Sequence, residues 1–454
     1  MVAYAAAELP SKCFPLPKCF KAAVVGHWLS MLDRRLRIWP MALLLLATMV
    51  TAGCVGQAPT PAPLPTLEPA PEYIKVGFSI SLSGSYARKG ECSLQAIELW
   101  ADWVNSQGGI YIREYGRKIP VKLVYYDDES NREAAARIYE KLCVEDRVHV
   151  ALCPCSSLLT YAVAPILEKY RVTGFVYSTA STRMFQRGLK YIVQVVSPSS
   201  RYLADIIRML AESPDVREKP ETVAFVFADA EFPRSCAEAA KEAAESHGMR
   251  VVLFEEYSRE SADLTPVLSK VKALSPDVLL GGGYLPDALL MVRQMKELDV
   301  HVKLVGLLVA PPMPDFIEGL GRDALYIVGP TQWECGAAYS PEFGPTAEWF
   351  IEEVKRRYGI EPSYHHAEAF AACLILQKAI EEAGSLDSDR IREACSRLEL
   401  TTFFGKFKID PETGLQVAHS VVVIQIQEVD GELKRVIVWP PEVAQAKLIY
   451  PMSP

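Results

Sequence analysis

From residue 74 onward, short apolar runs alternate with longer stretches whose apolar positions recur at helical spacing. Short apolar runs of this kind predict buried parallel strands, and the amphipathic stretches predict the helices that cover them. The pattern occurs twice in succession, so it predicts an α/β protein with two doubly wound lobes. In such folds ligands bind in a cleft at the carboxyl ends of the strands. The predicted strands are 74–82, 121–126, 148–152, 173–177, 222–227, 251–255, 278–280 and 303–307. The predicted helices are 91–106, 158–170, 200–210, 234–246, 264–274 and 287–298.

The last part of the chain has a different pattern. Three consecutive helices are predicted at 346–358, 367–383 and 388–398, followed by strands at 403–409 and 420–429. Helices without intervening strands indicate that the chain returns to an earlier lobe. Earlier in the chain, Ser130 and Glu133 have the spacing of a capping box, which predicts that a helix starts there.

The first 71 residues predict export rather than fold. Three arginines, Arg34, Arg35 and Arg37, precede an apolar run that ends in Thr-Ala-Gly-Cys54, the parts of a secretory signal. The run is shorter than the ~20 residues that a membrane-spanning helix needs. We therefore assign 31–53 to a signal peptide, although an uncleaved apolar segment is the alternative. We expect 1–30 to be a non-native extension before a start at Met31, or else a genuine extension.

The ending Thr-Ala-Gly-Cys resembles the lipobox of prokaryotic lipoproteins, which implies a lipid on Cys54. A proline-rich segment follows, and proline removes backbone donors and fixes φ, so 54–72 is expected to be an extended tether. The sequence therefore predicts an extracytoplasmic protein held at the cell membrane by a lipid anchor.

Composition narrows the function classes further. Half of the residues are hydrophobic and the formal net charge is −8, which gives no basic surface for nucleic acid. Eight cysteines follow Cys54, an even number that permits disulfides whose pairing stays open. Cys153 and Cys155 lack zinc-site spacing, and His365 and His366 point two ways on a helix, so no metal is expected. No catalytic or cofactor-binding motif occurs, and we predict neither an enzyme nor a cofactor.

Several motifs occur in an order that resembles a known family. They are Ser83-Gly-Ser-Tyr-Ala, Asn105-Ser-Gln-Gly-Gly-Ile, Tyr126-Asp-Asp-Glu-Ser, Cys155-Ser-Ser, Gly282-Gly-Tyr-Leu-Pro-Asp, Gly359-Ile-Glu-Pro-Ser-Tyr and Phe403-Phe-Gly-Lys-Phe. Over 73–454 the chain resembles the leucine/isoleucine/valine-binding class of type I periplasmic solute-binding proteins, the capture components of ABC importers. The resemblance implies three crossings between lobes, near Ser197, Pro330 and Gly405. Lobe one would be 73–196 plus 331–404, lobe two 198–329 plus 406–430, and 431–454 a C-terminal tail.

The first lobe supplies one set of candidate ligand-binding residues. Hydroxyls and free N–H groups at a helix start favour a carboxylate, and the resemblance implies that Ser156 binds it, with Ser157 beside it. The alternative is that these serines only cap the helix. After the next strand, the resemblance implies contacts from Ala180 and Thr182, with Ser178 as the fallback. Lys89 would lie at the cleft mouth, unless it is simply solvated.

The second set of candidates is aromatic. Tyr284 matches an aromatic residue that packs on the ligand, with a core tyrosine as the alternative. Phe232 stands where the family usually has a tyrosine, and Pro233 replaces the following glycine, which puts a hydroxyl contact there in doubt. Trp333 follows the second crossing, where it either floors the cleft or belongs to the core.

One departure concerns the acid that pairs the ligand's ammonium group in amino-acid binders. The resemblance places it after strand 303–307, but the sequence there is Leu-Val-Ala-Pro-Pro-Met313. An unpaired buried ammonium costs several kcal/mol. Either another acid substitutes, with Glu334 or Asp229 as candidates, or the ligand is an amide, a urea-like compound or a carboxylic acid.

The resemblance thus implies an extracytoplasmic protein that captures a small polar solute by hinge closure and delivers it to ABC permease and ATPase subunits. The alternative is a ligand sensor of the same fold that acts through a membrane partner.

Overall fold

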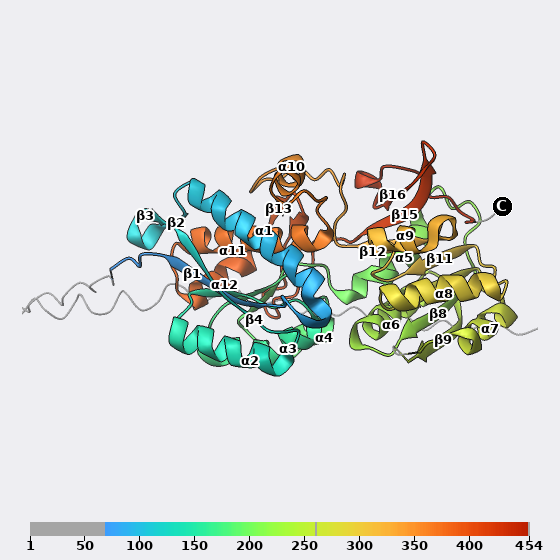
Figure 1. Cartoon of the computed structure of the whole chain (residues 1–454), viewed down its shortest axis with the longest axis horizontal. Helices are drawn as coiled ribbons and strands as arrows, with labels where there is room; N and C mark the ends of the chain where they lie inside the picture. Colours follow the sequence, from blue (N-terminus) through green and yellow to red (C-terminus); the bar gives the residue numbers. More distant parts are fainter. Residues whose placement is uncertain (1–68, 259–260, 453–454) are drawn as a thin grey trace, which may run out of the picture. The chain divides into compact units, whose positions relative to one another are not determined.

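Two β-sheets organise the part of the chain that the computed structural model describes, residues 69–452 except 259–260. The first sheet has five strands, all parallel, in the order β4-β1-β5-β6-β7 (Figure 1). Its strands are β1 (Ile74–Ile80), β4 (Val121–Asp127), β5 (Val150–Leu152), β6 (Gly174–Val176) and β7 (Ile192–Gln194). The predicted α/β class with parallel sheets is confirmed.

The second sheet has seven strands in the order β16-β15-β12-β11-β10-β8-β9. The strands from β9 to β12 are parallel, whereas β15 and β16 are added antiparallel. The strands are β8 (Thr222–Ala228), β9 (Arg250–Tyr257), β10 (Val278–Gly282), β11 (Leu304–Leu307), β12 (Val328–Thr331), β15 (Val422–Val429) and β16 (Glu432–Trp439). Two short hairpins complete the strands, β2 (Ile110–Ile112) with β3 (Arg117–Ile119) and β13 (Leu400–Thr402) with β14 (Gly405–Phe407).

Helices connect most of these strands. They are α1 (Ala87–Ser106), α2 (Arg132–Lys141), α3 (Ser157–Tyr170), α4 (Thr182–Phe185), α5 (Tyr202–Glu212), α6 (Glu231–Ser246), α7 (Thr265–Leu274), α8 (Leu285–Glu297), α9 (Pro314–Leu320), α10 (Ala347–Tyr358), α11 (Tyr364–Ala383) and α12 (Ser388–Arg397). Within the described ranges, none of these helices is both long and apolar enough to cross a membrane.

Alternation along the strands explains how both faces of each sheet become buried. Val150 and Leu152 of β5 face the core that contains α1 and α11, whereas Ala151, between them, faces the core that contains α2 and α3. In β8, Ala224 and Phe225 divide between two cores in the same way. Because successive side chains of a strand point to opposite faces, a strand with helices on both sides must be apolar throughout.

The start of α2 differs from its prediction. Asn131, not Ser130, caps the helix, because its side chain accepts a hydrogen bond from the Ala134 amide at 2.8 Å. Ser130 has a φ of 57° and donates its hydroxyl to the Ser83 carbonyl at 2.6 Å. The predicted capping box is therefore wrong. Ser130 links its loop to the loop of Ser83 by a hydrogen bond, and Asn131 is the N-cap residue.

The last strands also depart from the predicted boundaries. The backbone N–H of Gln194 in β7 donates a hydrogen bond to the Gly414 carbonyl at 2.9 Å, so the chain after β14 still lies against the first sheet. The passage to the second sheet comes between His419 and Val422, later than the crossing expected at Gly405. Moreover, β16 lies within 431–454, the range predicted to be a C-terminal tail, and it forms an edge of the second sheet.

Hydrogen bonds join the three connecting segments between the sheets. Ser197 donates its amide to the Gln332 side chain at 2.9 Å and its hydroxyl to the His419 carbonyl at 2.8 Å. The His419 ring also lies 3.1 Å from the Gln332 carbonyl. A Cβ added to Gly405 would lie 2.6 Å from this ring, which explains why glycine stands there. Gly405, the predicted third crossing, therefore lies close in space to the connecting segments, although the chain passes to the second sheet only after His419.

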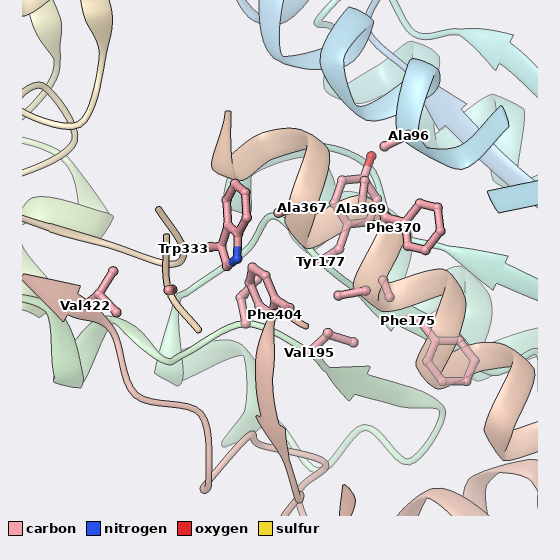
Figure 2. Close-up of a cluster of buried hydrophobic side chains, with 14 of the residues drawn as sticks. Ala96, Phe175, Tyr177, Val195, Trp333, Ala367, Ala369, Phe370, Phe404 and Val422 are labelled. Carbon is pink, nitrogen blue, oxygen red and sulfur yellow. The ribbon is translucent and has the colours of Figure 1, made fainter. Parts of the chain in front are cut away.

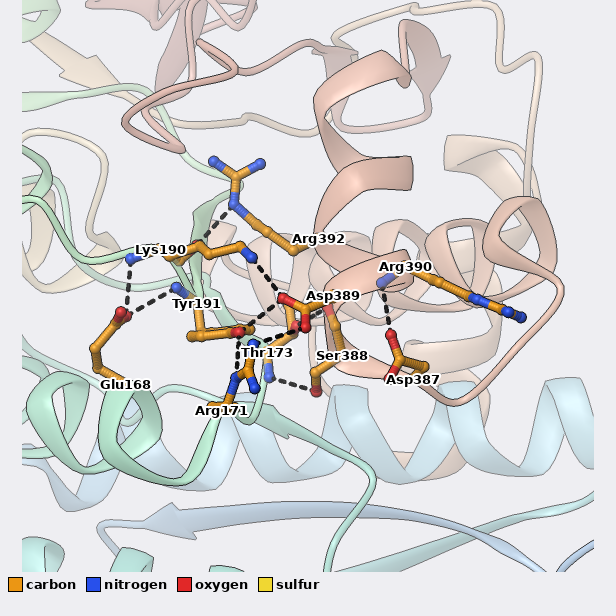
Figure 3. Close-up of polar contacts among 10 residues, drawn as sticks. All are labelled: Glu168, Arg171, Thr173, Lys190, Tyr191, Asp387, Ser388, Asp389, Arg390 and Arg392. Carbon is orange, nitrogen blue, oxygen red and sulfur yellow. Dashed lines mark hydrogen bonds and ion pairs between the residues drawn. The ribbon is translucent and has the colours of Figure 1, made fainter. Parts of the chain in front are cut away.

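Polar contacts fasten α12 to the edge of the first sheet (Figure 3). Asp389 accepts a hydrogen bond from the Tyr191 hydroxyl at 2.7 Å and forms ion pairs with Arg171 and Lys190. Arg392 donates to the Lys190 carbonyl at 2.7 Å. These contacts join α12 to residues about 200 positions earlier in the chain, as expected if the last helices return to the first sheet.

All eight cysteines in the described ranges are unpaired. The disulfides that an even number permitted are therefore absent from this part of the chain.

Candidate functional site

A cavity of about 550 Å³ is lined by residues from elements on both sheets. Seven of the nine predicted ligand-binding residues line it: Lys89, Ser156, Ser157, Ser178, Ala180, Phe232 and Tyr284. Its volume lies within the usual range for small-molecule sites, ~300–1,000 Å³. The position matches the expectation for parallel sheets, because many of these residues follow the carboxyl ends of strands.

The start of α3 forms one wall of this cavity. Ser156 is the N-cap residue, and its side chain accepts a hydrogen bond from the Leu159 amide at 3.4 Å. Its φ of 120° lies in a region that side chains rarely adopt, and such strain is concentrated at functional sites. Ser157 begins the helix and also lines the cavity. Since the first N–H groups of a helix lack partners within it, this wall suits a carboxylate.

A buried acid that the sequence analysis missed lies in the same cavity. Glu368 of α11 is only 2% exposed, and its carboxylate lies 2.9 Å from Nδ1 of His365. Burial raises its pKa to about 8, although the Ser178 hydroxyl and the Lys89 charge act in the opposite direction. Burial, with a smaller effect of Lys89, holds the pKa of His365 well below its ordinary value.

Ser178 interacts both with a residue just before the start of α3 and with Glu368. Its hydroxyl is 3.1 Å from the Cys155 sulfur, next to the start of α3, and it favours the ionised form of Glu368. Lys89, in the first turn of α1, is half-buried, and its ammonium lies 6.0 Å from the centre of the Tyr284 ring. The first-sheet side of the cavity therefore combines hydroxyls, an acid and a lysine.

The second-sheet side is mainly aromatic. Tyr284 is the N-cap residue of α8, and Phe232 lies in the first turn of α6, so this helix starts before its predicted boundary. Phe232 packs edge-on against Tyr202, with ring centres 5.1 Å apart. Two carboxylates on this side are already paired, Asp229 with Arg234 at 2.8 Å and Glu231 with Arg183 at 3.1 Å.

Two predicted residues lie outside the cavity. Trp333 is 1% exposed and lies in the buried hydrophobic cluster that Figure 2 shows. Its ring packs against Phe350 and Phe403, with ring centres 6.0 and 6.1 Å away. It belongs to the core, which was the alternative. The Thr182 hydroxyl lies 3.3 Å from that of Ser199, and Thr182 does not line the cavity.

Both predicted substitute acids form ion pairs with arginines. Glu334 is 8% exposed, pairs with Arg435 at 3.2 Å, and lies outside the main cavity. Asp229 lines the cavity, but its side chain is 63% exposed and holds Arg234. The signal in the sequence is that Glu368 is the one charged residue in the stretch 367–376 of α11, which is otherwise apolar, because acids are rarely buried without a partner.

Among the described residues, no cluster of histidine, cysteine and acidic side chains is arranged to hold a metal ion.

Comparison with known proteins assigns the family. A family model described as periplasmic binding protein matches residues 73–432, so the chain belongs to this family. Leu/Ile/Val-binding protein homolog 7 of Brucella suis biovar 1 (strain 1330) is 24% identical over 424 residues, which cover 90% of this chain and 99% of the relative.

Solved structures show the same fold. The leucine binding protein LivK of Thermotoga maritima has a TM-score of 0.66 at 22% identity, covering 81% of this chain and 99% of that protein. A solute binding protein of an ABC transporter from Rhodopseudomonas palustris BisB5, solved with 3,4-dihydroxy benzoic acid, also has a TM-score of 0.66 at 19% identity. This match covers 81% of this chain and 96% of that protein. The fold is that of type I periplasmic binding proteins, which bind solutes and are not enzymes.

Proposed function

We propose that this protein captures a small polar solute, such as an amino acid, an amide or a related compound, and delivers it to an ABC permease. The observation that carries the proposal is the cavity of about 550 Å³ between hydroxyl and charged groups on one side and aromatic rings on the other. A ligand that touches both sides binds the closed form better than the open form. It can shift the equilibrium between them only through that difference in affinity.

The size of the required effect is modest. A difference of ~5.5 kcal/mol takes a population from 1:99 to 99:1. Two or three charged hydrogen bonds from the first-sheet side, at ~1.5–3 kcal/mol each, are of this order when they form only in the closed state.

Thermal unfolding of the purified protein with a panel of amino acids, amides, urea compounds and small carboxylic acids tests the proposal. A ligand at a hundred times its dissociation constant stabilises the folded state by ~2.7 kcal/mol. We expect at least one solute to raise the Tm and to reduce the radius of gyration in solution scattering. If no solute of these classes does so, the proposed capture function is wrong.

We further propose that the protein is held at the outer face of the cell membrane by a lipid on Cys54, which lies outside the described residues. The support is the signal-like segment before Cys54 and the proline-rich segment after it. Cys54→Ala should move the protein from the membrane to the soluble fraction and remove the lipid mass. Cys143→Ala, a half-buried cysteine of the folded body, is the matched control and should change neither.

Delivery to a permease needs a separate test. Ligand-loaded protein should stimulate ATP hydrolysis by the reconstituted permease and ATPase subunits, whereas the empty protein should stimulate it less. Binding without such stimulation would favour a sensor that acts through a different membrane partner.

A further inference from the structure

The buried acid of the cavity lacks a permanent positive partner. Glu368 is 2% exposed, and the basic group within ion-pair distance of it in the described residues is the His365 ring at 2.9 Å. Because burial keeps His365 neutral, its Nδ1 can orient the Glu368 carboxyl group but cannot balance its charge. Buried charges are normally paired, so either the carboxyl group is protonated or a cation enters the cavity.

The other acids near the site are already engaged. Asp229 holds Arg234, Glu231 holds Arg183, and Glu334 holds Arg435. Beyond β11, the cavity is lined by Val309 rather than by an acid. Glu368 is therefore the carboxyl group of this cavity that a ligand can use without breaking an existing ion pair.

The surroundings of Glu368 indicate how the charged groups of a fitting ligand are arranged. Ser178 touches Cys155 at 3.1 Å, Ser156 is the next residue, and Ser178 also favours the ionised form of Glu368. The Ser178 hydroxyl therefore lies close both to the start of α3, which suits a carboxylate, and to Glu368, which suits a cation. A zwitterion that carries its ammonium and carboxylate groups on the same carbon atom matches this arrangement.

We propose that Glu368, oriented by His365, pairs the ammonium group of a zwitterionic ligand, from helix α11 instead of from the segment after β11. The inference rests on the proposed solute-binding function and names the residue that selects the ligand. A ligand without an ammonium group would have to leave Glu368 protonated.

Binding of an ammonium group is then coupled to the release of a proton. The empty site holds the pKa of Glu368 at about 8, so the acid is mostly protonated at pH 7. An ammonium group beside it favours the carboxylate, and the proton leaves to solvent. Below pH 8, the affinity for an ammonium ligand should therefore rise about tenfold per pH unit.

The cysteine, tyrosine and histidine side chains that face Glu368 do not titrate between pH 6 and 7.5. Burial raises the pKa of Cys155 to about 11, and it raises the pKa values of Tyr177, Tyr202 and Tyr364 above that of an ordinary tyrosine. His365 stays neutral, and Lys89 of α1 is the remaining charged neighbour. The pH dependence between 6 and 7.5 therefore reports Glu368.

The experiment compares amines with matched compounds that lack the ammonium group. The twenty common L-amino acids are screened by thermal stabilisation of the purified protein, each hit together with its N-acetyl and deaminated forms. Calorimetry between pH 6 and 7.5, in two buffers of different ionisation enthalpy, then gives the affinity and the number of protons released. We expect the free amino acid to bind best and to release close to one proton.

Variants assign the effect to Glu368. Glu368→Gln should weaken binding on the order of 100-fold at pH 7.5 and abolish both the proton release and the pH slope. Glu368→Asp keeps the charge, so it should retain the slope with a lower affinity, which preserves the test if the glutamine variant does not fold. Glu382→Gln is the matched control, because Glu382 lies on the same helix outside the cavity and pairs with Lys378.

The outcomes separate the two proposals. If an amide or a simple acid binds and closes the protein while no amine does, the inference about Glu368 is wrong and the capture function stands. The same holds if Glu368→Gln folds and keeps the affinity and pH slope of the unchanged protein. If no compound of any class binds, both are overturned.

Discussion

The two sides of the cavity differ in chemistry. The side built on the five-stranded sheet presents Ser156, Ser178, Lys89 and Glu368, whereas the side built on the seven-stranded sheet presents the rings of Phe232 and Tyr284. The carboxylates of the second side are paired with arginines. We infer that the first side orients a ligand through directed polar contacts, and that the second side excludes water when the cavity closes.

The difference follows from local structure. On the first side, a helix start and a buried stretch of α11 hold polar groups in place, so little freedom is lost when a ligand arrives. Aromatic rings tolerate a range of ligand shapes, because their contacts are less directional than hydrogen bonds. Substitutions on the first side should therefore change affinity more than those on the second.

The largest expected effect concerns the stability of the empty protein. The pKa of Glu368 rises from an ordinary 4.5 to about 8 on folding, so the folded state holds a proton that the unfolded state loses. This contribution is fully present below pH 4.5 and is lost as the pH rises towards 8, by about 3–5 kcal/mol. Relative to Glu368→Gln, the Tm of the unchanged protein should fall over this range. Equal pH profiles for the two proteins would contradict the raised pKa.

The next effect tests the carboxylate wall. If Ser156 binds the ligand carboxylate as predicted, Ser156→Ala removes that hydrogen bond and should weaken binding about 10- to 100-fold, as expected for a hydrogen bond to a charged group. Loss of the cap costs only about 1 kcal/mol of stability, so the protein stays folded. Asp387→Ala, which removes the cap of α12, should cost similar stability without changing affinity. Calorimetry measures both, and unchanged affinity in Ser156→Ala would remove this residue from the site.

A smaller effect is expected on the aromatic side. Phe232→Ala removes a ring that packs on Tyr202 and lines the cavity, and it should weaken binding about tenfold through lost apolar contact. Most of this loss should appear as faster dissociation in stopped-flow measurements. Phe254→Ala, a ring on β9 outside the cavity, is the control. A larger loss than in Ser156→Ala would reverse the comparison between the two sides.

The smallest effect concerns the ion pairs that join the two sides. Arg183 of α4 pairs with Glu231 and Glu238 of α6, each at 3.1 Å, and the arginine side chain is 50% exposed. Exposed ion pairs contribute only ~0–1 kcal/mol and weaken with salt. Arg183→Gln should therefore change affinity less than about fivefold. In 1 M salt the variant and the unchanged protein should become indistinguishable, and a large salt-independent loss would assign Arg183 a direct role in binding.

Much of the fold could be predicted from local pattern. The alternation of apolar strands and helices predicted the two doubly wound units, because a strand covered on both faces must be apolar throughout. Seven of nine candidate residues line the cavity, since positions that follow the carboxyl ends of parallel strands meet at one edge. β16 was missed because its exposed outer residues weaken the strand signal.

The sequence by itself determined where most strands and helices form, and that Ser156 and Ser157 lie at the start of a helix. These properties depend on neighbouring residues, and the sequence therefore contains them directly. Only the tertiary structure decided that Glu368 and His365 face the cavity and that Trp333 does not. Helix α11 is buried along most of its length, so its pattern does not distinguish a face towards the core from a face towards a ligand. That choice depends on how α11 packs against α1 and the first sheet, a contact between residues far apart in the chain.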